Sequence, residues 1–174
     1  MTDIRVRRAR TSDVPAIRAI AEPLVQRRIL LGKEWVEFYG AVPEFRVAET
    51  PAGDLVGFGA LHVIWEDLGE VRTLAVADAW RGHGVGHLLL AALEADALEL
   101  GLSRLFCLTF EVDFFTRHGF RDMGDETVDP AVYAELVRSS DEGIAEFLDL
   151  ARVKPNTLGN TRMLRTLRSA SSGG

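Results

Sequence analysis

The sequence predicts an α/β fold of the α+β kind, in which helices flank a mixed, mostly antiparallel sheet of about six to seven strands. Two observations lead to this prediction. Runs of branched and aromatic residues alternate with amphipathic helical patterns over residues 4–167. The turn RGHGVG at 81–86 then joins one such run to a long helical pattern. Since 174 residues contain no linker or repeat, we expect a single domain over 1–168 and a flexible tail over 169–174.

The N-terminal half predicts one strand, two helices and a three-strand meander. Thr11, Ser12 and Asp13, followed by Pro15, have the composition of a helix start. Pro51–Asp54 supplies turn residues between two strand-like runs. The expected elements are strand Ile4–Arg8, a helix from Val14 to near Arg28, helix Lys33–Tyr39, and strands Phe45–Glu49, Leu55–Ile64 and Glu70–Val76.

The C-terminal half begins with the long helical pattern Val85–Leu100, which Gly101 ends. The apolar run Arg104–Thr109 predicts a central strand that lies parallel to its predecessor across the helical crossover. The remaining elements are helix Asp113–His118, a strand after Gly119-Phe120-Arg121, helix Pro130–Ser139, an amphipathic segment Glu142–Leu150 of open type, and strand Thr161–Leu167.

Composition excludes several classes of protein. A formal net charge of −6 argues against broad nucleic-acid binding. The single cysteine, Cys107, allows no intramolecular disulfide and lies in an apolar run typical of a buried thiol. No run reaches the ~18 apolar residues of a membrane span, and the N-terminus lacks the apolar core of a signal peptide. We therefore expect a cytoplasmic protein with a small-molecule substrate, and no nucleic-acid or membrane partner; a homodimer stays open.

The glycine turn predicts a cradle for a phosphate group. Gly82, Gly84 and Gly86 allow sharp turns that aim backbone N–H groups at one point, and the following helix adds its unpaired N–H groups. The spacing departs from the dinucleotide fingerprint, and no P-loop lysine follows it. Alternatively, the glycines only shape a tight connection.

The order of elements, with two motifs, resembles the GCN5-related N-acetyltransferase (GNAT) family. The first motif is Arg81, Gly84 and Gly86, and the second is Phe115 with Gly119-Phe120. The resemblance implies a sheet splayed between its fourth and fifth strands, with acetyl-CoA as cosubstrate. We expect no metal, because His62, His83 and His87 lack the arrangement of a metal site.

Longer segments are similar to the short actinobacterial N-acetylglutamate synthases, also called amino-acid N-acetyltransferases. The matching segments are ILLGK at 29–33, VGFGALHVIWEDLGEVRTLAV at 56–76, LFCLTFEVDFFTRHGF at 105–120 and AEFLDLARVKPNTLGNTRML at 145–164. This similarity implies acetylation of the α-amine of L-glutamate, or of L-glutamine, by direct attack in a ternary complex. That reaction is the first step of arginine biosynthesis.

The resemblance also implies which residues bind the cofactor. The strand edge at 74–76 would pair with the pantetheine arm, the loop at 81–87 would hold the pyrophosphate, and the Val76 amide would stabilise the oxyanion. The implied cofactor residues are Leu74, Ala75, Val76, Arg81, Gly82, His83, Gly84, Val85, Gly86, His87 and Phe115.

Glu70 is the first candidate for the general base that an ammonium acceptor requires. It lies six residues before Val76, which places both on one face of a regular strand, and some family members carry a matching glutamate that works through a water. The alternatives are that Glu70 is a solvated strand-end charge and that Glu111 is the base. Phe115 replaces the tyrosine that donates a proton in many members, so His118, Tyr133, a water or no dedicated acid stay open for that role.

Two carboxylates on a glutamate acceptor require basic and hydroxyl groups in the pocket. The residues that match or neighbour pocket residues of longer relatives are Leu31, Lys33, Thr73, Thr109, Thr161 and Arg162. Strand alternation favours Thr73 inward and Arg72 on the opposite face. Each basic residue also has an ordinary reading as surface charge.

Two other functions stay open. The chain could acetylate another amine or a peptide, in which case the acceptor pocket would be acidic. Because Phe115 cannot donate a proton, the chain could also be a non-catalytic regulatory module that binds acyl-CoA.

Overall fold

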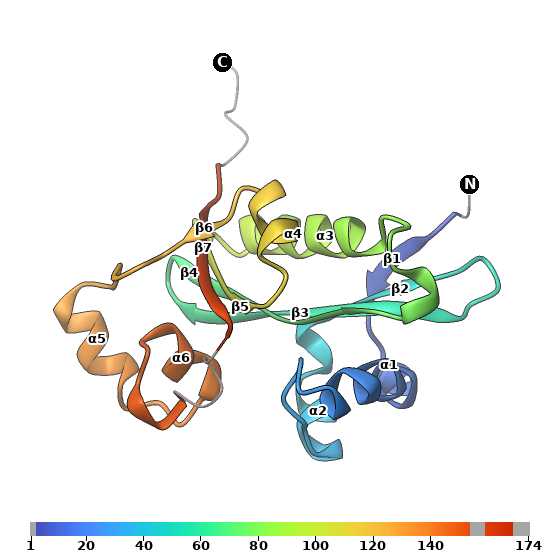
Figure 1. Ribbon diagram of the computed structural model, residues 1–174, viewed down its shortest axis with the longest axis horizontal. Coiled ribbons are helices and arrows are strands. Elements are labelled where there is room, and N and C mark those ends of the chain that lie inside the picture. The colour runs from blue at the N-terminus through green and yellow to red at the C-terminus, as the bar shows by residue number, and fades with distance from the viewer. Residues whose placement is uncertain (1–2, 154–158, 169–174) are drawn as a thin grey trace. The chain divides into compact units, whose positions relative to one another are not determined.

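The structure is a computed structural model that describes residues 3–153 and 159–168. The chain divides into two compact units. Figure 1 colours the chain by residue number. The first unit is Met1–His62 with Val71–Leu100, and the second unit is Val63–Glu70 with Gly101–Gly174. The single domain over 1–168 stays a prediction, and the predicted tail over 169–174 lies outside the described residues.

The strands follow the order β1 (Arg5–Arg8), β2 (Phe45–Glu49), β3 (Leu55–Trp65), β4 (Leu68–Val76), β5 (Arg104–Thr109), β7 (Thr161–Thr166) and β6 (Arg121–Asp122). β4 and β5 are parallel, whereas β1–β2, β2–β3, β5–β7 and β6–β7 are antiparallel pairs. The prediction of a mixed, mostly antiparallel sheet is therefore confirmed. So is the parallel crossover, because the helix α3 connects β4 to β5.

The first unit packs helices on both faces of its strands. α1 and α2 pack with β2 and β3 around Phe45 and Phe58, and α3 packs on the opposite face (Figure 1). A Cβ on Gly57 would lie 3.0 Å from the Ala75 carbonyl oxygen and from Leu89, so glycine allows this close approach. The elements are β1 (Arg5–Arg8), α1 (Val14–Gln26), α2 (Trp35–Gly40), β2 (Phe45–Glu49), β3 (Leu55–Trp65), β4 (Leu68–Val76) and α3 (Val85–Glu99), of which β3 and β4 extend into the second unit.

Three part-buried ion pairs join elements of the first unit. Arg7 on β1 donates hydrogen bonds of 2.8 and 3.0 Å to Asp13, next to the start of α1, and one of 2.8 Å to Glu49 on β2. These bonds hold the pKa of Asp13 below its ordinary value. Arg46 on β2 forms a bidentate pair with Asp96, a buried carboxylate of α3.

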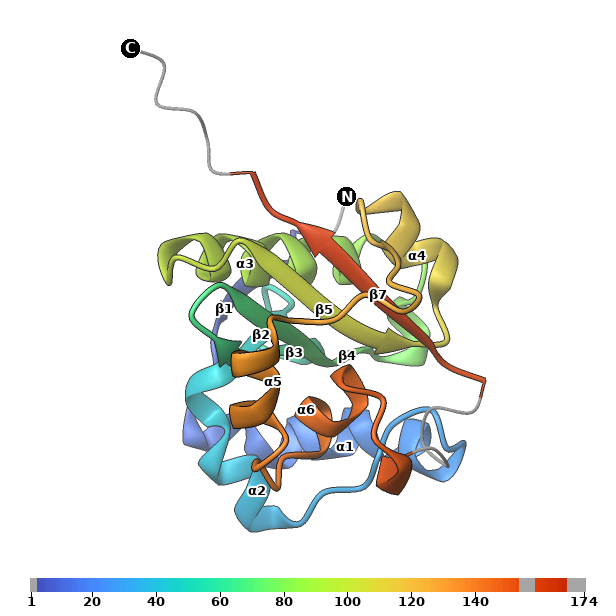
Figure 2. The ribbon, with the colours of Figure 1, turned by 90° about the vertical axis from the view of Figure 1, so that its left-hand side faces the viewer.

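The second unit has its own core beneath two short helices. The rings of Phe106 and Phe147 meet edge to face with centroids 5.2 Å apart. Figure 2 shows α5 and α6 on the same side of β5 and β7, where their apolar residues share this cluster. The elements are β5 (Arg104–Thr109), α4 (Val112–Arg117), β6 (Arg121–Asp122), α5 (Pro130–Leu136), α6 (Glu142–Phe147) and β7 (Thr161–Thr166).

Several predicted boundaries move by a few residues for local reasons. α2 begins at Trp35, and not at Lys33, because Glu34 caps it: the Glu34 N–H donates to the Glu37 carboxylate at 2.6 Å. β4 begins two residues early, since Leu68 pairs with Arg104. The undecided segment at 142–150 is helical over Glu142–Phe147, where Asp141 caps the start by accepting from Ile144 N–H. Asp149, at φ +57°, lies just past the end.

We expect the substitution Asp13→Asn to lower the free energy of unfolding by about 2 kcal/mol at pH 7, because it leaves buried Arg7 without its main partner. The folded pKa of Asp13 is depressed, so this stabilisation is present above the unfolded value of about 3.9 and is lost as the pH falls through the lower folded value. The difference between the wild type and the variant should therefore shrink below about pH 4 in urea titrations.

The exposed pair Arg27–Asp78 supplies the matched control. Its side chains are 45% and 60% exposed, and we expect Asp78→Asn to change stability by less than about 0.5 kcal/mol at either pH. Equal effects of Asp13→Asn and Asp78→Asn would contradict the argument.

Candidate functional site

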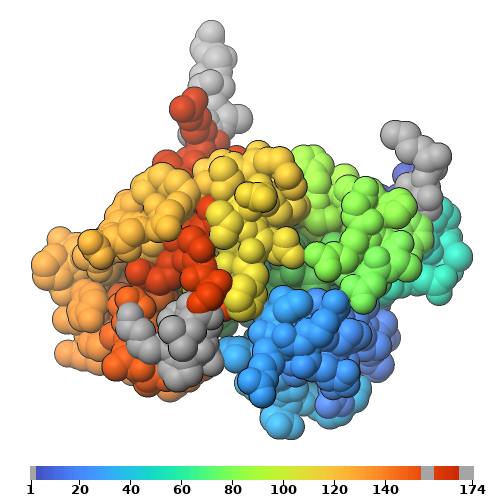
Figure 3. Space-filling view, in the orientation of Figure 1, coloured from blue at the N-terminus to red at the C-terminus, as the bar shows by residue number. Residues whose placement is uncertain are grey.

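The turn between β4 and α3 is an exposed glycine loop. Gly82 and Gly84 have φ of +77° and +80°, a left-handed conformation in which other residues are strained. Arg81 to Gly84 are exposed, and Figure 3 shows this green part of the chain at the surface. Gly84 is the N-cap residue of α3 and provides no side-chain cap, so the first-turn N–H groups keep their capacity to bind an anion.

The loop is held in shape by its own residues. Trp80 N–H donates to the Ala77 carbonyl at 2.8 Å, and the His83 ring nitrogen contacts the Arg81 carbonyl at 3.0 Å. The His83 ring also packs against Trp80. His83 therefore folds back onto the loop.

The end of β4 presents amides on the edge away from β3. Ala77 N–H donates to the Val56 carbonyl of β3 at 2.8 Å. Because backbone groups alternate along a strand, the N–H groups of Val76 and Leu74 face the other edge. β4 pairs with β5 over Leu68–Glu70 and continues beyond this register to Val76.

Thr73 interrupts β4 with two unusual features. Its φ of +50° is an outlier for a β-branched residue, and its hydroxyl is buried with no hydrogen-bond partner among residues 3–153 and 159–168. Both features cost free energy, which points to a functional reason for them. The left-handed residue also breaks the regular alternation on which we based a shared face for Glu70 and Val76 and opposite faces for Arg72 and Thr73.

Glu70 lies in the second unit and is only 4% exposed. The alternative that it is a solvated strand-end charge is therefore wrong. Glu70 is the register partner of Phe106 on β5. Burial, with a smaller contribution from the charge of Glu70, raises the pKa of Cys107 well above its ordinary value, so that thiol is a poor nucleophile. The other base candidate, Glu111, is exposed at the N-cap of α4.

The register of β5 with β7 separates the predicted pocket residues of the second unit. Thr109 and Thr161 are direct partners across the two strands. The Thr109 hydroxyl accepts from Glu111 N–H at 2.8 Å and keeps its own proton to donate. Arg162 alternates with Thr161, so its side chain lies on the opposite face of β7.

The Arg162 guanidinium is hydrogen-bonded to backbone carbonyls. Its guanidinium donates to Glu146 O at 3.1 Å, to Gly124 O at 3.3 Å and to Phe147 O. This arrangement favours a structural role for Arg162, and its contact with an acceptor carboxylate stays a prediction.

The candidates for the proton donor differ in their surroundings. Phe115 is buried, and its ring packs edge to face with Phe114 and Phe120. His118 contacts the Phe114 carbonyl at 2.7 Å, whereas Tyr133 on α5 is 37% exposed. The donor stays open.

Leu31 and Lys33 lie in the segment between α1 and α2. The Leu31 side chain is 49% exposed and Lys33 is half-buried. The predicted acceptor residues are thus divided: Leu31, Lys33 and Thr73 belong to the first unit, and Thr109, Thr161 and Arg162 to the second unit.

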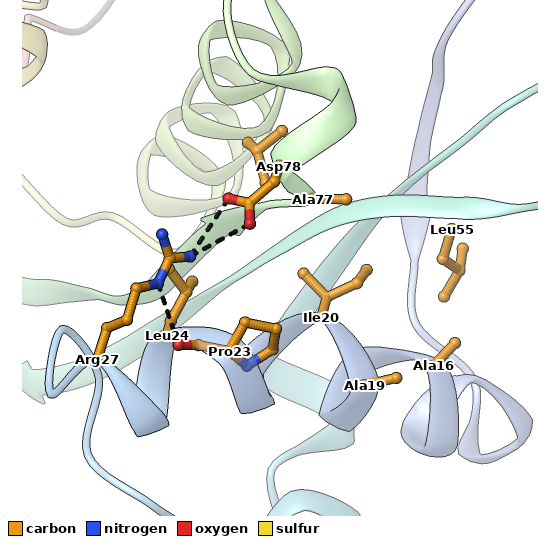
Figure 4. A pocket seen from close by; sticks show the side chains of 10 residues that line it. Ala16, Ala19, Ile20, Pro23, Leu24, Arg27, Leu55, Ala77 and Asp78 are labelled. Atoms are coloured by element: carbon orange, nitrogen blue, oxygen red, sulfur yellow. Dashed lines mark hydrogen bonds and ion pairs between the residues drawn. The ribbon is translucent and has the colours of Figure 1, made fainter.

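A pocket of about 280 Å³ that we did not predict lies in the first unit, between α1 and the end of β4 (Figure 4). Arg27 reaches across its rim to Asp78 at 3.3 Å. The small residues Ala16 and Ala19 on α1 are the only sequence signal for it, and that signal is weak. The lining residues are Ala16, Ala19, Ile20, Pro23, Leu24, Arg27, Leu55, Val76, Ala77 and Asp78.

The described residues hold neither a candidate metal cluster nor a candidate membrane-spanning helix. Over 3–153 and 159–168, no cluster of three or more His, Cys, Asp or Glu side chains is suited to a metal ion. In the same ranges, no helix has the length and apolar character needed to span a membrane.

The chain is similar to several known proteins. It is 54% identical over 164 residues to the amino-acid acetyltransferase of Mycobacterium tuberculosis, with 93% of this chain and 94% of that protein covered. The crystal structure of Rv2747 from the same organism, in complex with CoA and NLQ, superposes with a TM-score of 0.90 and covers 94% of this chain and 99% of that chain. An N-acetylglutamate synthase from Neisseria gonorrhoeae, complexed with coenzyme A and N-acetyl-glutamate, is 26% identical with a TM-score of 0.74; the match covers 97% of this chain and 36% of that chain.

The acetyltransferase (GNAT) family model matches residues 20–120, which include β4, the glycine loop, α3 and the Gly119-Phe120 motif. The family match and the high identity to a named amino-acid acetyltransferase agree with the cradle described above. The chain belongs to the GNAT family of N-acetyltransferases, which use acetyl-CoA.

Proposed function

We propose that this acetyltransferase transfers the acetyl group of acetyl-CoA to the α-amine of L-glutamate or L-glutamine, in the cytoplasm, as the first step of arginine biosynthesis. The observation that supports acetyl-CoA binding is the exposed glycine loop at the start of α3. This loop follows the Leu74 and Val76 amides of β4, which face away from β3. The choice of substrate is supported by the similarity to the Mycobacterium amino-acid acetyltransferase and to the Neisseria N-acetylglutamate synthase.

The residues present fit this cofactor. The loop amides at 82–87 and the dipole of α3 would hold a pyrophosphate, and the Leu74 and Val76 amides would pair with the amide-bearing pantetheine arm. When bound, acetyl-CoA supplies an activated acetyl group as a thioester. The Val76 amide would donate to the oxyanion that develops on the acetyl carbonyl.

The acceptor amine has to lose a proton before it attacks, because an α-amine is mostly protonated near neutral pH. Glu70 would accept that proton, through a water where the two do not touch. Its burial distinguishes it from the exposed Glu111 as the candidate for this role. A thiol leaving group has a pKa of about 8.5, so its departure requires little help from an acid.

Each unit holds its own candidates for acceptor recognition. In the first unit these are the half-buried Lys33 ammonium and the Thr73 hydroxyl, which has no hydrogen-bond partner in the part of the chain that the structure describes. In the second unit they are Thr161 and its partner Thr109, whose hydroxyl keeps its own proton to donate. Hydroxyl and ammonium donors suit the carboxylates of an amino acid.

A thiol-release assay with acetyl-CoA and each of the common amino acids tests the proposal. We expect turnover with L-glutamate, L-glutamine or both, and little with lysine, peptides or drug-like amines. No turnover with either expected acceptor at millimolar concentration would overturn the choice of substrate. Turnover with none of the amines, together with tight CoA binding, would favour the regulatory module.

In the same assay, Glu70→Gln should lower kcat by about 100-fold or more, since it removes the general base but keeps the shape of the side chain. CoA affinity, measured by calorimetry, should stay within about two-fold, because the cradle belongs to other residues. Glu111→Gln is the paired variant. If it lowers kcat and Glu70→Gln does not, Glu111 is the base.

Gly84→Ala should weaken CoA binding by about ten-fold or more, because a residue with a Cβ resists the left-handed geometry that aims the loop amides. Gly53→Ala is a matched control: Gly53 has a φ of +90°, equally open surroundings and a place in the turn between β2 and β3. Both variants should lose similar stability, and only Gly84→Ala should lose CoA affinity. Equal CoA affinities for the two would refute the cradle.

Thr73→Val should raise the KM for the amino acid by about ten-fold, while Thr73→Ser stays near the wild type, because only valine lacks the hydroxyl. Valine keeps the β-branched shape and the backbone strain. Since Thr73→Val also removes a buried unpartnered polar atom, its melting temperature should equal or exceed that of the wild type. An unchanged KM would show that the hydroxyl does not contact the acceptor.

A further inference from the structure

We propose that Arg162 is a positioning residue for Glu70 that acts through α6, and that it is not a ligand of the acceptor carboxylate. The inference deepens the proposed function and rests on Glu70 being its general base. Every residue that carries it belongs to the second unit.

The first step is the clamp on the end of α6. The guanidinium of Arg162 donates to the carbonyls of Glu146 and Phe147, the last two residues of the helix, and to Gly124 before α5. The last carbonyls of a helix have no partner within it and carry partial negative charge, which a cation satisfies. The planar guanidinium of arginine has donors in several directions and can bind several carbonyls at once, whereas the ammonium of lysine is a compact point charge.

The second step is that α6 depends on such a clamp. It has six residues, too few for a helix to be stable by itself. Two residues past its end, Asp149 has a φ of +57°, a strained conformation for a non-glycine residue that surrounding contacts have to offset. The contacts at this end of the helix are the hydrogen bonds from Arg162 to Glu146 and Phe147 and the apolar packing of Ile144 and Phe147.

The third step connects α6 to the base. Phe147 places its ring edge to face on Phe106, with centroids 5.2 Å apart. Phe106 is the register partner of Glu70 on the neighbouring parallel strand. Phe147, whose carbonyl accepts from Arg162, therefore packs on Phe106, the residue beside Glu70. Arg162 lies on the same sheet face, because its register partner Leu108 follows Phe106 by two residues on β5.

The clamp thus keeps α6 against the face that carries Glu70. This packing excludes water from that carboxyl, which is 4% exposed, and limits its orientations. Removal of the Arg162 clamp should therefore lower the rate of the chemical step. It should not weaken the binding of glutamate more than the binding of glutamine, which has one negative charge fewer.

A double-mutant cycle with steady-state kinetics tests this. Arg162→Met should lower kcat by about ten-fold in the wild type, with the KM values for glutamate and glutamine within about two-fold. In the Glu70→Gln background, Arg162→Met should lower kcat by less than about two-fold, because the carboxylate that Arg162 positions is absent. Arg162→Lys should recover part of the loss, and Arg168→Met, at an exposed arginine just after β7, should behave as the wild type.

Hydrogen–deuterium exchange provides a readout apart from activity. The amides of α6 should exchange faster in Arg162→Met than in the wild type, with an intermediate rate in Arg162→Lys. If α6 exchanges faster but Glu70→Gln leaves kcat unchanged, the base assignment has failed while the clamp stands.

Three outcomes overturn the inference. A KM that rises for glutamate far more than for glutamine would make Arg162 an acceptor ligand. Equal losses of kcat in the wild-type and Glu70→Gln backgrounds would disconnect Arg162 from Glu70. Unchanged exchange of α6 would show that the clamp does not hold the helix.

Discussion

The backbone hydrogen bonds of β4 are the constraint on which both halves of the proposed chemistry depend. Near its start, β4 pairs with β5 over Leu68–Glu70, and just past its end the Ala77 amide bonds to β3. Backbone polar groups need partners, and the outward amides of Leu74 and Val76 are suited to take them from a bound molecule. A cofactor with amide groups can therefore add to this strand in the way that a peptide adds to a sheet edge.

Strain and close packing are concentrated around the same strand. Thr73 has a left-handed backbone and a buried hydroxyl without a partner among the described residues, a combination that folding alone would not favour. Gly57 lets the helix that follows the glycine loop lie close to β3 and to the Ala75 carbonyl. The ion pairs of Arg7 with Asp13 and of Arg46 with Asp96 secure the surrounding strands and helices. The stable parts of the first unit thus support a strained functional strand.

The second unit contains the buried carboxylate of Glu70. Glu70 sits beside Phe106, and aromatic and aliphatic residues of α5 and α6 cover that face. A carboxyl in such a place suits proton transfer better than an exposed one. Arg162 provides the charge that completes the end of α6, which explains why an arginine predicted at the acceptor faces away from Thr161.

The sequence by itself determined the order of the elements, the parallel crossover and the glycine loop, because hydrophobic periodicity and glycine spacing are local properties of the chain. Phe45–Glu49 and Arg104–Thr109 were predicted to the residue. Only the tertiary structure decided the burial of Glu70, the strain at Thr73 and the use of Arg162. These depend on register and on contacts between residues far apart in sequence, and one left-handed residue suffices to break the alternation that a sequence argument assumes.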